Sequence, residues 1–426
     1  MNPPARLLAL SLLAATALTG CPSEPAPEPV SDTLDAAVLA ALSMERVRDG
    51  VDLLADDAWG GRTPGSPGHA AAADWVAQTM ADTGLEALDG GFEVAHTLVQ
   101  EDQRWMFDES GAVVQAPTGE LPGRQFIGLL PGTDPVLADE YILVMAHYDH
   151  LGVNAAGEVF NGAFDDATAV SALLELAAVL VDQGVSFRRS LLFLITDMEE
   201  GGLKGARAWV DDPTVPLGEI ALALSIDPIG RPLVGDYAPL AALGSERCPG
   251  ARALWDRVEA LTGVPILQIN REPLVVFGSD QDAFWDHPDP LPGAWLASPG
   301  MTWYHTTSDT AETIDYRSVR DHLGAIAQGI AIFANRDERC VDLGAQDLAT
   351  SDVDEALELI AALFATGELT SAEALDLSAL QTPLENAAAA GAVDTEAQTA
   401  FFQLLVLVIN ELAPGHPGPI PPPFPG

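Results

Sequence analysis

Five histidine and carboxylate residues stand at the ends of apolar segments in this sequence, which is where strands present side chains to a common edge. They are His147 after the apolar run 141–146, Asp165 at the start of the next helical pattern, Glu200 shortly after 191–196, Asp227 after 220–226, and His305 in the loop beyond 293–298. In open α/β sheets, ligands bind outside the carboxyl ends of the strands. Imidazole nitrogen and carboxylate oxygen are ligands that Zn²⁺ accepts. The pattern therefore predicts that these five side chains converge on a metal site.

Two histidines and three carboxylates suit a pair of zinc ions that share one carboxylate. Asp165 is the expected bridge, because it heads a helix between the two histidine-bearing segments. A metal-bound histidine is usually oriented by a carboxylate, and Asp149 is the candidate for His147, although its side chain can instead bind nearby backbone. Glu199 precedes the ligand Glu200 and is the candidate general base that takes a proton from water.

The segments that must position these residues read as alternating strands and helices. The strand candidates are 141–146, 191–196, 220–226, 273–277 and 293–298, and the strongest helix candidate, 167–182, lies between the first two. Strand, helix and strand in succession favour parallel neighbours joined by right-handed crossovers. The sequence therefore predicts an α/β fold with a mixed, mostly parallel central sheet flanked by helices.

The remaining segments are less regular. Helical patterns occur at 34–56 and 69–85, and the Gly- and Pro-rich loop 60–68 between them is either a connector or a lid over a site. Residues 92–133 indicate irregular strands and turns. Residues 351–412, rich in Ala, Leu and Glu, indicate several short helices that form a small C-terminal appendage.

Several motifs together resemble the di-zinc aminopeptidase family of bacterial exopeptidases, whose relatives include glutamate carboxypeptidase-like enzymes and glutaminyl cyclases. The matching segments, within about 45–340, are Gly61 to Gly68, Ala146 to Gly152, Asn161 to Ala169, Glu199 to Ala206, Asp227 to Gly230, and Tyr304 to Thr310. The resemblance implies a zinc-exopeptidase fold of the phosphorylase/hydrolase-like kind. It also implies that the five converging residues are the zinc ligands, with Asp165 as the bridge. Gln281 departs from the family, which commonly has a histidine there.

The resemblance assigns further roles near the metals. Glu199 would be the general base, Asp149 would orient His147, and Tyr304 would help to hold the developing oxyanion. We therefore expect an exopeptidase that releases N-terminal residues of a peptide substrate through a hydroxide bridging two zinc ions. The alternatives are a glutaminyl cyclase-like acyltransferase, which uses one zinc, and an inactive binding protein on the same fold. The presence of both histidines disfavours the cyclase, and Glu199 together with the complete ligand set disfavours the inactive protein.

The charge balance excludes some partners. The chain has 19 Lys and Arg against 63 Asp and Glu, a formal net charge of −44. Nucleic-acid binding requires a basic patch, so we expect no nucleic acid as partner. The acidity is typical of a solvated surface that keeps a protein soluble, and a negative rim would also suit a substrate with a free amine. Oligomeric state is left open.

The N-terminus resembles a bacterial lipoprotein signal. Its only charge is Arg6, the run 7–18 is apolar, and Leu18-Thr19-Gly20-Cys21 closes it; an ordinary signal peptide with an incidental Cys is the alternative. The expected division is a signal at 1–20, a Pro-rich tether at 21–33, a catalytic domain at 34–340, the appendage at 341–413 and a Pro/Gly-rich tail at 414–426. Lipidated Cys21 would hold the protein at the bacterial cell envelope, facing the periplasm or the exterior. Whether Cys248 and Cys340 pair is left open.

Overall fold

The computed structural model describes residues 31–88, 91–100, 104–107, 113–115, 118–270, 278–410 and 412. The expected signal, Cys21, most of the tether and the Pro/Gly-rich tail lie outside these residues, as does the strand candidate 273–277. Within the described ranges, no helix combines the length and the apolar character that crossing a membrane requires.

The centre of the molecule is a nine-stranded mixed sheet in the order β1-β5-β9-β6-β10-β13-β11-β12, with β2 also paired to β5. The strands are β1 (Glu86–Ala87), β2 (Glu93–Gln100), β5 (Gly119–Leu130), β6 (Tyr141–His147), β9 (Ser190–Thr196), β10 (Ile220–Ile226), β11 (Leu240–Leu243), β12 (Ile266–Leu267) and β13 (Gly293–Ala297). The central strands β9, β6, β10 and β13 are mutually parallel, and antiparallel pairs flank them. Two small two-stranded sheets pair β3 (Arg104–Phe107) with β4 (Val113–Gln115) and β7 (Gly152–Val153) with β8 (Val159–Phe160).

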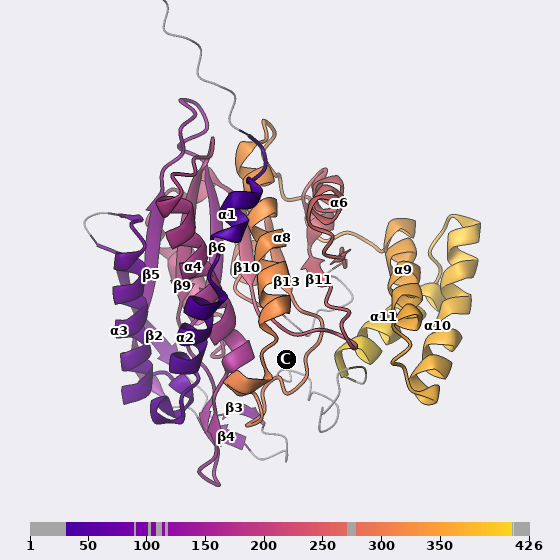
Figure 1. Cartoon of the computed structure of the whole chain (residues 1–426), viewed down its shortest axis with the longest axis horizontal. Helices are drawn as coiled ribbons and strands as arrows, with labels where there is room; N and C mark the ends of the chain where they lie inside the picture. The colour runs from indigo at the N-terminus through magenta and orange to yellow at the C-terminus, as the bar shows by residue number, and fades with distance from the viewer. Residues whose placement is uncertain are drawn as a thin grey trace, which may run out of the picture.

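Helices cover both faces of this sheet (Figure 1). They are α1 (Ala36–Ala40), α2 (Met44–Leu54), α3 (Pro67–Asp82), α4 (Thr168–Asp182), α5 (Lys204–Asp211), α6 (Ala251–Thr262), α7 (Asp282–Trp285), α8 (Tyr316–Asn335), α9 (Thr350–Thr366), α10 (Ser371–Ala390) and α11 (Thr395–Asn410). Because side chains alternate along a strand, Val144 packs in the core under α2, α4 and α8, whereas Leu143 packs with Trp209 of α5 and Phe284 of α7. The α/β class with a mixed, mostly parallel sheet is confirmed.

The C-terminal helices α9–α11 complete the cover of the second face. Figure 1 shows them at the end of the molecule away from α3. Their apolar side chains, such as Leu404 and Ile360, share one buried core with Trp295 of β13 and Leu243 of β11. These helices therefore pack directly on the sheet beyond the area that α5 and α7 cover.

Most expected elements lie where the sequence indicates. The strands β6, β9, β10 and β13 match their apolar runs within a residue or two, and α4 matches the helix candidate 167–182. The segment 34–56 divides into α1 and α2. The loop 60–68 contains the end of a 3₁₀ helix, η1 (Asp57–Arg62), and the start of α3. The strands β11 and β12 were not expected.

A disulfide joins Cys248 to Cys340 across 92 residues of sequence, which answers the question left open above. Cys248 precedes α6, and Cys340 follows α8. The two helices pack in the same core through Trp255 and Phe333, whose ring centroids lie 5.6 Å apart. The bond therefore fastens the chain just before the segment that leads to α9–α11.

Candidate metal centre

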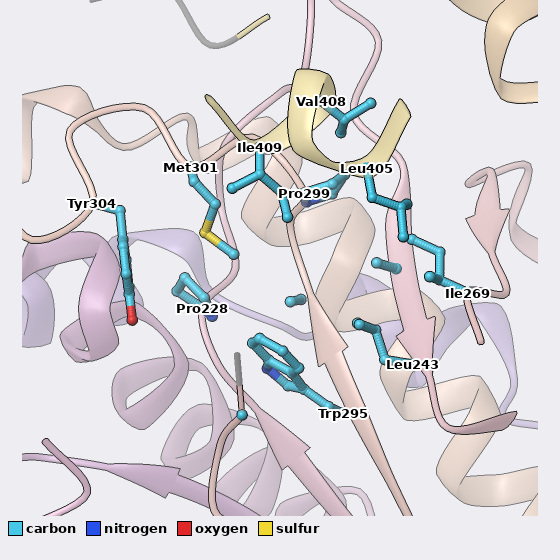
Figure 2. Close-up of a pocket in the computed structure, with 13 residues that line it drawn as sticks. Pro228, Leu243, Ile269, Trp295, Pro299, Met301, Tyr304, Leu405, Val408 and Ile409 are labelled. Atoms are coloured by element: carbon cyan, nitrogen blue, oxygen red, sulfur yellow. The ribbon is translucent and has the colours of Figure 1, made fainter. Parts of the chain in front are cut away.

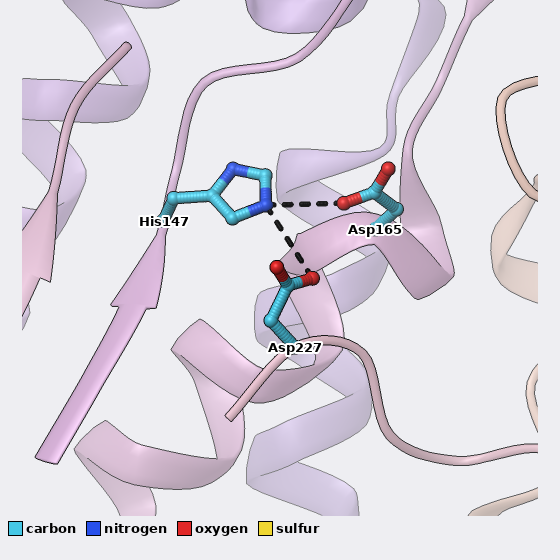
Figure 3. Close-up of side chains that lie close together, drawn as sticks. All are labelled: His147, Asp165 and Asp227. Atoms are coloured by element: carbon cyan, nitrogen blue, oxygen red, sulfur yellow. Dashed lines mark ion pairs between the residues drawn. The ribbon is translucent and has the colours of Figure 1, made fainter. Parts of the chain in front are cut away.

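The first ligand group lies at the carboxyl ends of β6 and β10. His147 is the last residue of β6 and Asp227 directly follows β10, while Asp165 lies in the irregular turn η2 (Ala163–Ala167) before α4, where its own backbone angles are not helical. The His147 Nε2 atom is 3.1 Å from Asp165 Oδ1 and 3.6 Å from Asp227 Oδ1 (Figure 3). All three side chains are buried, and their ligand atoms are close enough to hold one metal ion.

The second ligand group uses the other oxygen of Asp165. The His305 Nε2 atom is 2.9 Å from Asp165 Oδ2 and 3.2 Å from Glu200 Oε2. His150 joins this group, because its Nδ1 atom is 2.7 Å from Glu200 Oε1 and 3.7 Å from Asp165 Oδ2. His150, Asp165 and Glu200 can also hold one metal ion. Asp165 therefore belongs to both groups and offers one oxygen to each.

The close approaches between these atoms are not hydrogen bonds. His147 Nε2, His305 Nε2, Asp165 Oδ2 and Glu200 Oε1 are buried and have no hydrogen-bond partner among the described residues. Buried polar atoms in proteins are normally hydrogen-bonded, so such a concentration of unpaired ones requires a reason. Burial favours the neutral carboxyl, but contacts with His147 and His305 hold the pKa of Asp165 well below its ordinary value. Converging nitrogen atoms and an ionised carboxylate are the donor set that suits zinc.

Asp149 supports both ligand groups through different atoms. Its backbone carbonyl lies 3.2 Å from His147 Nδ1, and its carboxylate lies 3.5 Å from the same nitrogen. The carboxylate oxygens also accept the backbone N–H groups of Glu199 and Glu200 at 3.0 and 3.3 Å. Asp149 therefore holds the histidine of one group and the backbone of the ligand in the other.

Neighbouring residues also hold the Asp227 side chain and the Asp165 backbone. The Ser279 hydroxyl donates to Asp227 Oδ2 at 2.5 Å, which leaves Oδ1 facing His147. The Asp309 carboxylate accepts the backbone N–H of Asp165 at 3.2 Å, and Arg231 pairs with Asp309 at 2.6 Å. Such contacts to ligand residues orient them and raise metal affinity.

Arg62 is a buried cation that connects the loops carrying the ligands. Its guanidinium donates to the carbonyl oxygens of Tyr148, Asn161 and Gly162 at 2.6 to 2.9 Å. A further bond reaches Leu54 at 2.8 Å, so α2 is tied to the same point. Through Arg62, the Gly- and Pro-rich segment is hydrogen-bonded to the loops at 148 and 162. It therefore stabilises the ligand-bearing loops, a role beyond that of a plain connector or a lid.

Glu199 and Tyr304 lie beside the ligand groups and are partly accessible. Burial raises the pKa of Glu199 well above its ordinary value, and His147 opposes this while Asp227 and Glu200 add to it. Burial also raises the pKa of the Tyr304 phenol, as do the charges of Asp165 and Glu200, so the phenol keeps its proton. The Tyr304 ring stacks on His305 with centroids 3.7 Å apart.

The structure brings the five predicted ligands together, with Asp149, Glu199 and Tyr304 around them, and their roles stay predictions. Sequence reasoning missed His150, Ser279 and Arg62. His150 and Arg62 stand inside quoted motifs, so the signal was present, but only the folded chain shows what they touch. Gln281 is buried, and its amide donates to Asp282 at 2.8 Å, away from both ligand groups.

His150 has little freedom to leave its position. A side chain at Gly162, whose φ is +59°, would come within 2.5 Å of the His150 ring. Glycine is the residue that adopts this backbone conformation at low cost. The His150 ring therefore lies so close to the 162 backbone that this position has no room for a side chain.

The fold and the two ligand groups define an α/β protein with a candidate metal centre. Residues 125–330 match the model of Peptidase family M28, which supports a metal-dependent hydrolase. The resemblance expected from the sequence motifs is thereby confirmed.

Solved structures share the fold at low sequence identity. A glutaminyl cyclase from an Acidobacteriales bacterium is 17% identical with a TM-score of 0.53, covering 74% of this chain and 98% of that one. An aminopeptidase from Aneurinibacillus sp. strain AM-1 is 15% identical with a TM-score of 0.52, covering 74% and 100%. LapB from Legionella pneumophila is 16% identical with a TM-score of 0.51, covering 73% and 77%. No curated protein sequence matches the chain.

Proposed function

We propose that this protein is a zinc-dependent exopeptidase that removes N-terminal residues from peptides. The observation that carries the proposal is the sharing of Asp165, whose Oδ1 faces His147 and whose Oδ2 faces His305. A carboxylate placed between two ligand groups fits a pair of metal ions. The Peptidase family M28 match and the fold shared with an aminopeptidase support the same function.

Each ligand group would hold one zinc ion. His147 and Asp227 would hold the first and Glu200 and His305 the second, with Asp165 common to both. Zinc there would supply Lewis-acid chemistry, because it withdraws electron density from a carbonyl oxygen and makes water more acidic. The unpaired nitrogen and oxygen atoms of the two groups supply the donors that zinc requires.

Glu199 would move the proton in this reaction. Its backbone is fixed by Asp149, and its side chain is not one of the ligands. A carboxyl group whose pKa is raised by burial is suited to accept a proton from water and then donate it to a leaving amine at neutral pH. The adjacent Glu200 remains a ligand.

Tyr304 would stabilise the negative charge that develops on the substrate carbonyl. Its phenol is kept protonated by burial and by the neighbouring carboxylates, so it is a hydrogen-bond donor. The stack on His305 fixes the ring beside the second ligand group. A donor already aimed at the oxyanion does not have to reorganise during the reaction, and this is the source of its catalytic effect.

The experiment that tests this proposal combines metal analysis with two assays. Purified protein is expected to contain close to two zinc ions per chain and to hydrolyse aminoacyl p-nitroanilides, and chelation is expected to abolish the hydrolysis. One tightly bound zinc with cyclisation of N-terminal glutamine would instead support a glutaminyl cyclase-like function. Protein without bound metal would refute both.

We also propose that the protein is exported and anchored through a lipid on Cys21, with residues 21–33 as the tether and 34–340 as the catalytic domain. The Cys248–Cys340 disulfide supports an oxidising compartment, because cytosolic thiols are kept reduced. Cys21→Ser is expected to release active protein from the membrane fraction. Unchanged retention of the variant would contradict the anchor without affecting the proposed chemistry.

A further inference from the structure

Figure 2 shows an apolar cavity whose lining includes residues next to the ligands in the chain. Two of its lining residues adjoin ligands in the chain, because Pro228 follows Asp227 and Tyr304 precedes His305. A third, Trp295 of β13, donates its indole N–H to the backbone carbonyl of Asp227. The cavity therefore begins where the metal-binding loops end, within reach of a substrate held at the metals.

One wall of the cavity comes from the C-terminal helix α11. Leu405, Val408 and Ile409 line it, and a spacing of three and four residues places them on one face of the helix. Figure 2 shows this face across from Trp295 and Met301. Leu405 and Val408 are buried in the core that α11 shares with β13 and β11. Helix α11 begins at Thr395, well beyond the Peptidase family M28 match of residues 125–330.

The residues that line the cavity determine which kind of chemical group it can accept. None of the described residues around the cavity carries a charge, and the Trp295 N–H is already bonded. An apolar group is therefore favoured, because a polar one would lose its hydrogen bonds with water. The cavity holds about 60 Å³ of space open to water-sized molecules, and one water needs roughly 10–15 Å³. This space suits a medium-sized aliphatic side chain.

We propose that α11 forms a wall of the pocket that receives the aliphatic side chain of the substrate's terminal residue, so that the appended helices take part in choosing the substrate. This inference rests on the proposed exopeptidase function. Helices α9 and α10 would hold α11 against β13 and β11. In this position Leu405, Val408 and Ile409 of α11 would contact the substrate. Residues 341–413 then act as a specificity element in addition to covering the sheet.

The test changes the size of one side chain on this wall. Ile409→Phe is expected to fill the cavity and to lower kcat/KM for leucyl p-nitroanilide by at least ~10-fold, because one misplaced methylene in an apolar pocket already changes discrimination 10–200-fold. Alanyl p-nitroanilide, whose side chain is short, is expected to change by less than about twofold. Ile409→Ala is expected to act in the opposite direction and to favour the phenylalanyl substrate.

The matched control is Phe402→Ala, which truncates a large apolar residue on the same helix that is 43% exposed and does not line the cavity. This variant is expected to keep the leucyl-to-alanyl ratio of the unaltered protein. Equal losses with both substrates in the Ile409 variants, or no change in either, would overturn the inference.

Ligand binding separates this inference from the proposed function. Calorimetric titration with free leucine is expected to show binding that Ile409→Phe weakens and Phe402→Ala leaves unchanged. If the unaltered protein hydrolysed no aminoacyl substrate but still bound leucine in this way, the proposed function would fail and the pocket would stand. If hydrolysis occurred but the Ile409 variants kept the leucyl-to-alanyl ratio of kcat/KM, only the pocket inference would be refuted, and the proposed function would stand.

Discussion

The two ligand groups that share Asp165 differ in what surrounds them. In the His147 group, the carboxylate of Asp227 is held by the Ser279 hydroxyl, and the far nitrogen of the histidine faces the Asp149 carbonyl. In the Glu200 group, Glu200 faces His150, whose two ring nitrogens have no hydrogen-bond partner among the described residues. The side chains of the first group face ordinary hydrogen-bond partners, whereas the Glu200 side chain faces a further potential ligand, although the Glu200 backbone N–H is held by Asp149.

The Asp165 carboxylate therefore contributes one oxygen to each of two groups with different surroundings. The side chains of the His147 group are already oriented by hydrogen bonds without metal. This favours tight metal binding, because the ligands need little reorganisation. The second group brings His150 and His305 to the two oxygens of Glu200, and Tyr304 stacks on His305. We therefore expect the His147 group to retain metal more firmly and the Glu200 group to lie closer to the chemistry.

The largest expected effect comes from removing the residue common to both groups. Asp165→Ala is expected to lose both zinc ions and to reduce peptide hydrolysis to background, because each group loses a ligand. The matched control is Asp166→Asn, since an amide oxygen can still accept the His147 N–H that Asp166 binds at 3.3 Å. Elemental analysis of both variants checks the pair, and retention of two zinc ions by Asp165→Ala would show that this carboxylate is not shared.

The next largest effect separates proton transfer by Glu199 from metal binding by the adjacent Glu200. Glu199→Gln is expected to keep both zinc ions while turnover falls by ~10²–10⁴-fold, the usual contribution of a positioned acid–base group. Glu200→Gln is expected to lower zinc content first, because it weakens a ligand of the second group only. Zinc occupancy and kcat are measured side by side, and the reverse pattern would exchange the two assignments.

A smaller effect is expected from Tyr304→Phe, which removes the hydroxyl and keeps the ring stacked on His305. Loss of one oxyanion donor typically lowers kcat by ~10²–10³-fold. The zinc content and KM are expected to change little, because the phenol oxygen is not a ligand in either group. A variant with normal kcat would exclude the hydroxyl from the reaction.

The smallest effect sharpens the contrast between the two groups. His150→Ala and Ser279→Ala are each expected to weaken zinc binding by ~10–100-fold, which is typical for residues that orient ligands. His150→Ala is expected to affect the ion held by Glu200, and Ser279→Ala the ion held by Asp227. Competition with a chelator measures the two affinities in each variant. Equal weakening of both ions by either change would mean that the groups do not act separately.

Much of the fold could be predicted from the sequence because its central strands are buried on both faces. Such strands read as continuous apolar runs, and β6, β9, β10 and β13 were found in this way. The strands β11 and β12 have four and two residues, which is too short for a periodic signal. β11 pairs with β13 and β12 pairs with β11, and no local pattern in the sequence indicates these pairings.

The same limit applies to the site. His147, Asp227 and Glu200 could be predicted because each lies at the end of a recognisable strand or within a few residues of it. His150 and Ser279 could not, because their roles depend on contacts to Glu200 and Asp227 across 50 and 52 residues of sequence. Leu405, Val408 and Ile409 look like ordinary core residues of a helix, and only their position opposite Trp295 connects them with a substrate. Local patterns indicate which residues have suitable chemistry, whereas tertiary packing decides which of them meet.

The Cys248–Cys340 disulfide has a consequence for the protein after it has been damaged. The bond closes a covalent loop that contains β13, His305 and α8. If a protease cut the chain once inside this loop, the disulfide would keep both fragments joined, and His305 would stay covalently linked to the sheet that carries His147. A single cut before Cys248 or after Cys340 would separate the chain into two pieces. The bond thus divides the chain into a part that tolerates one break and parts that do not.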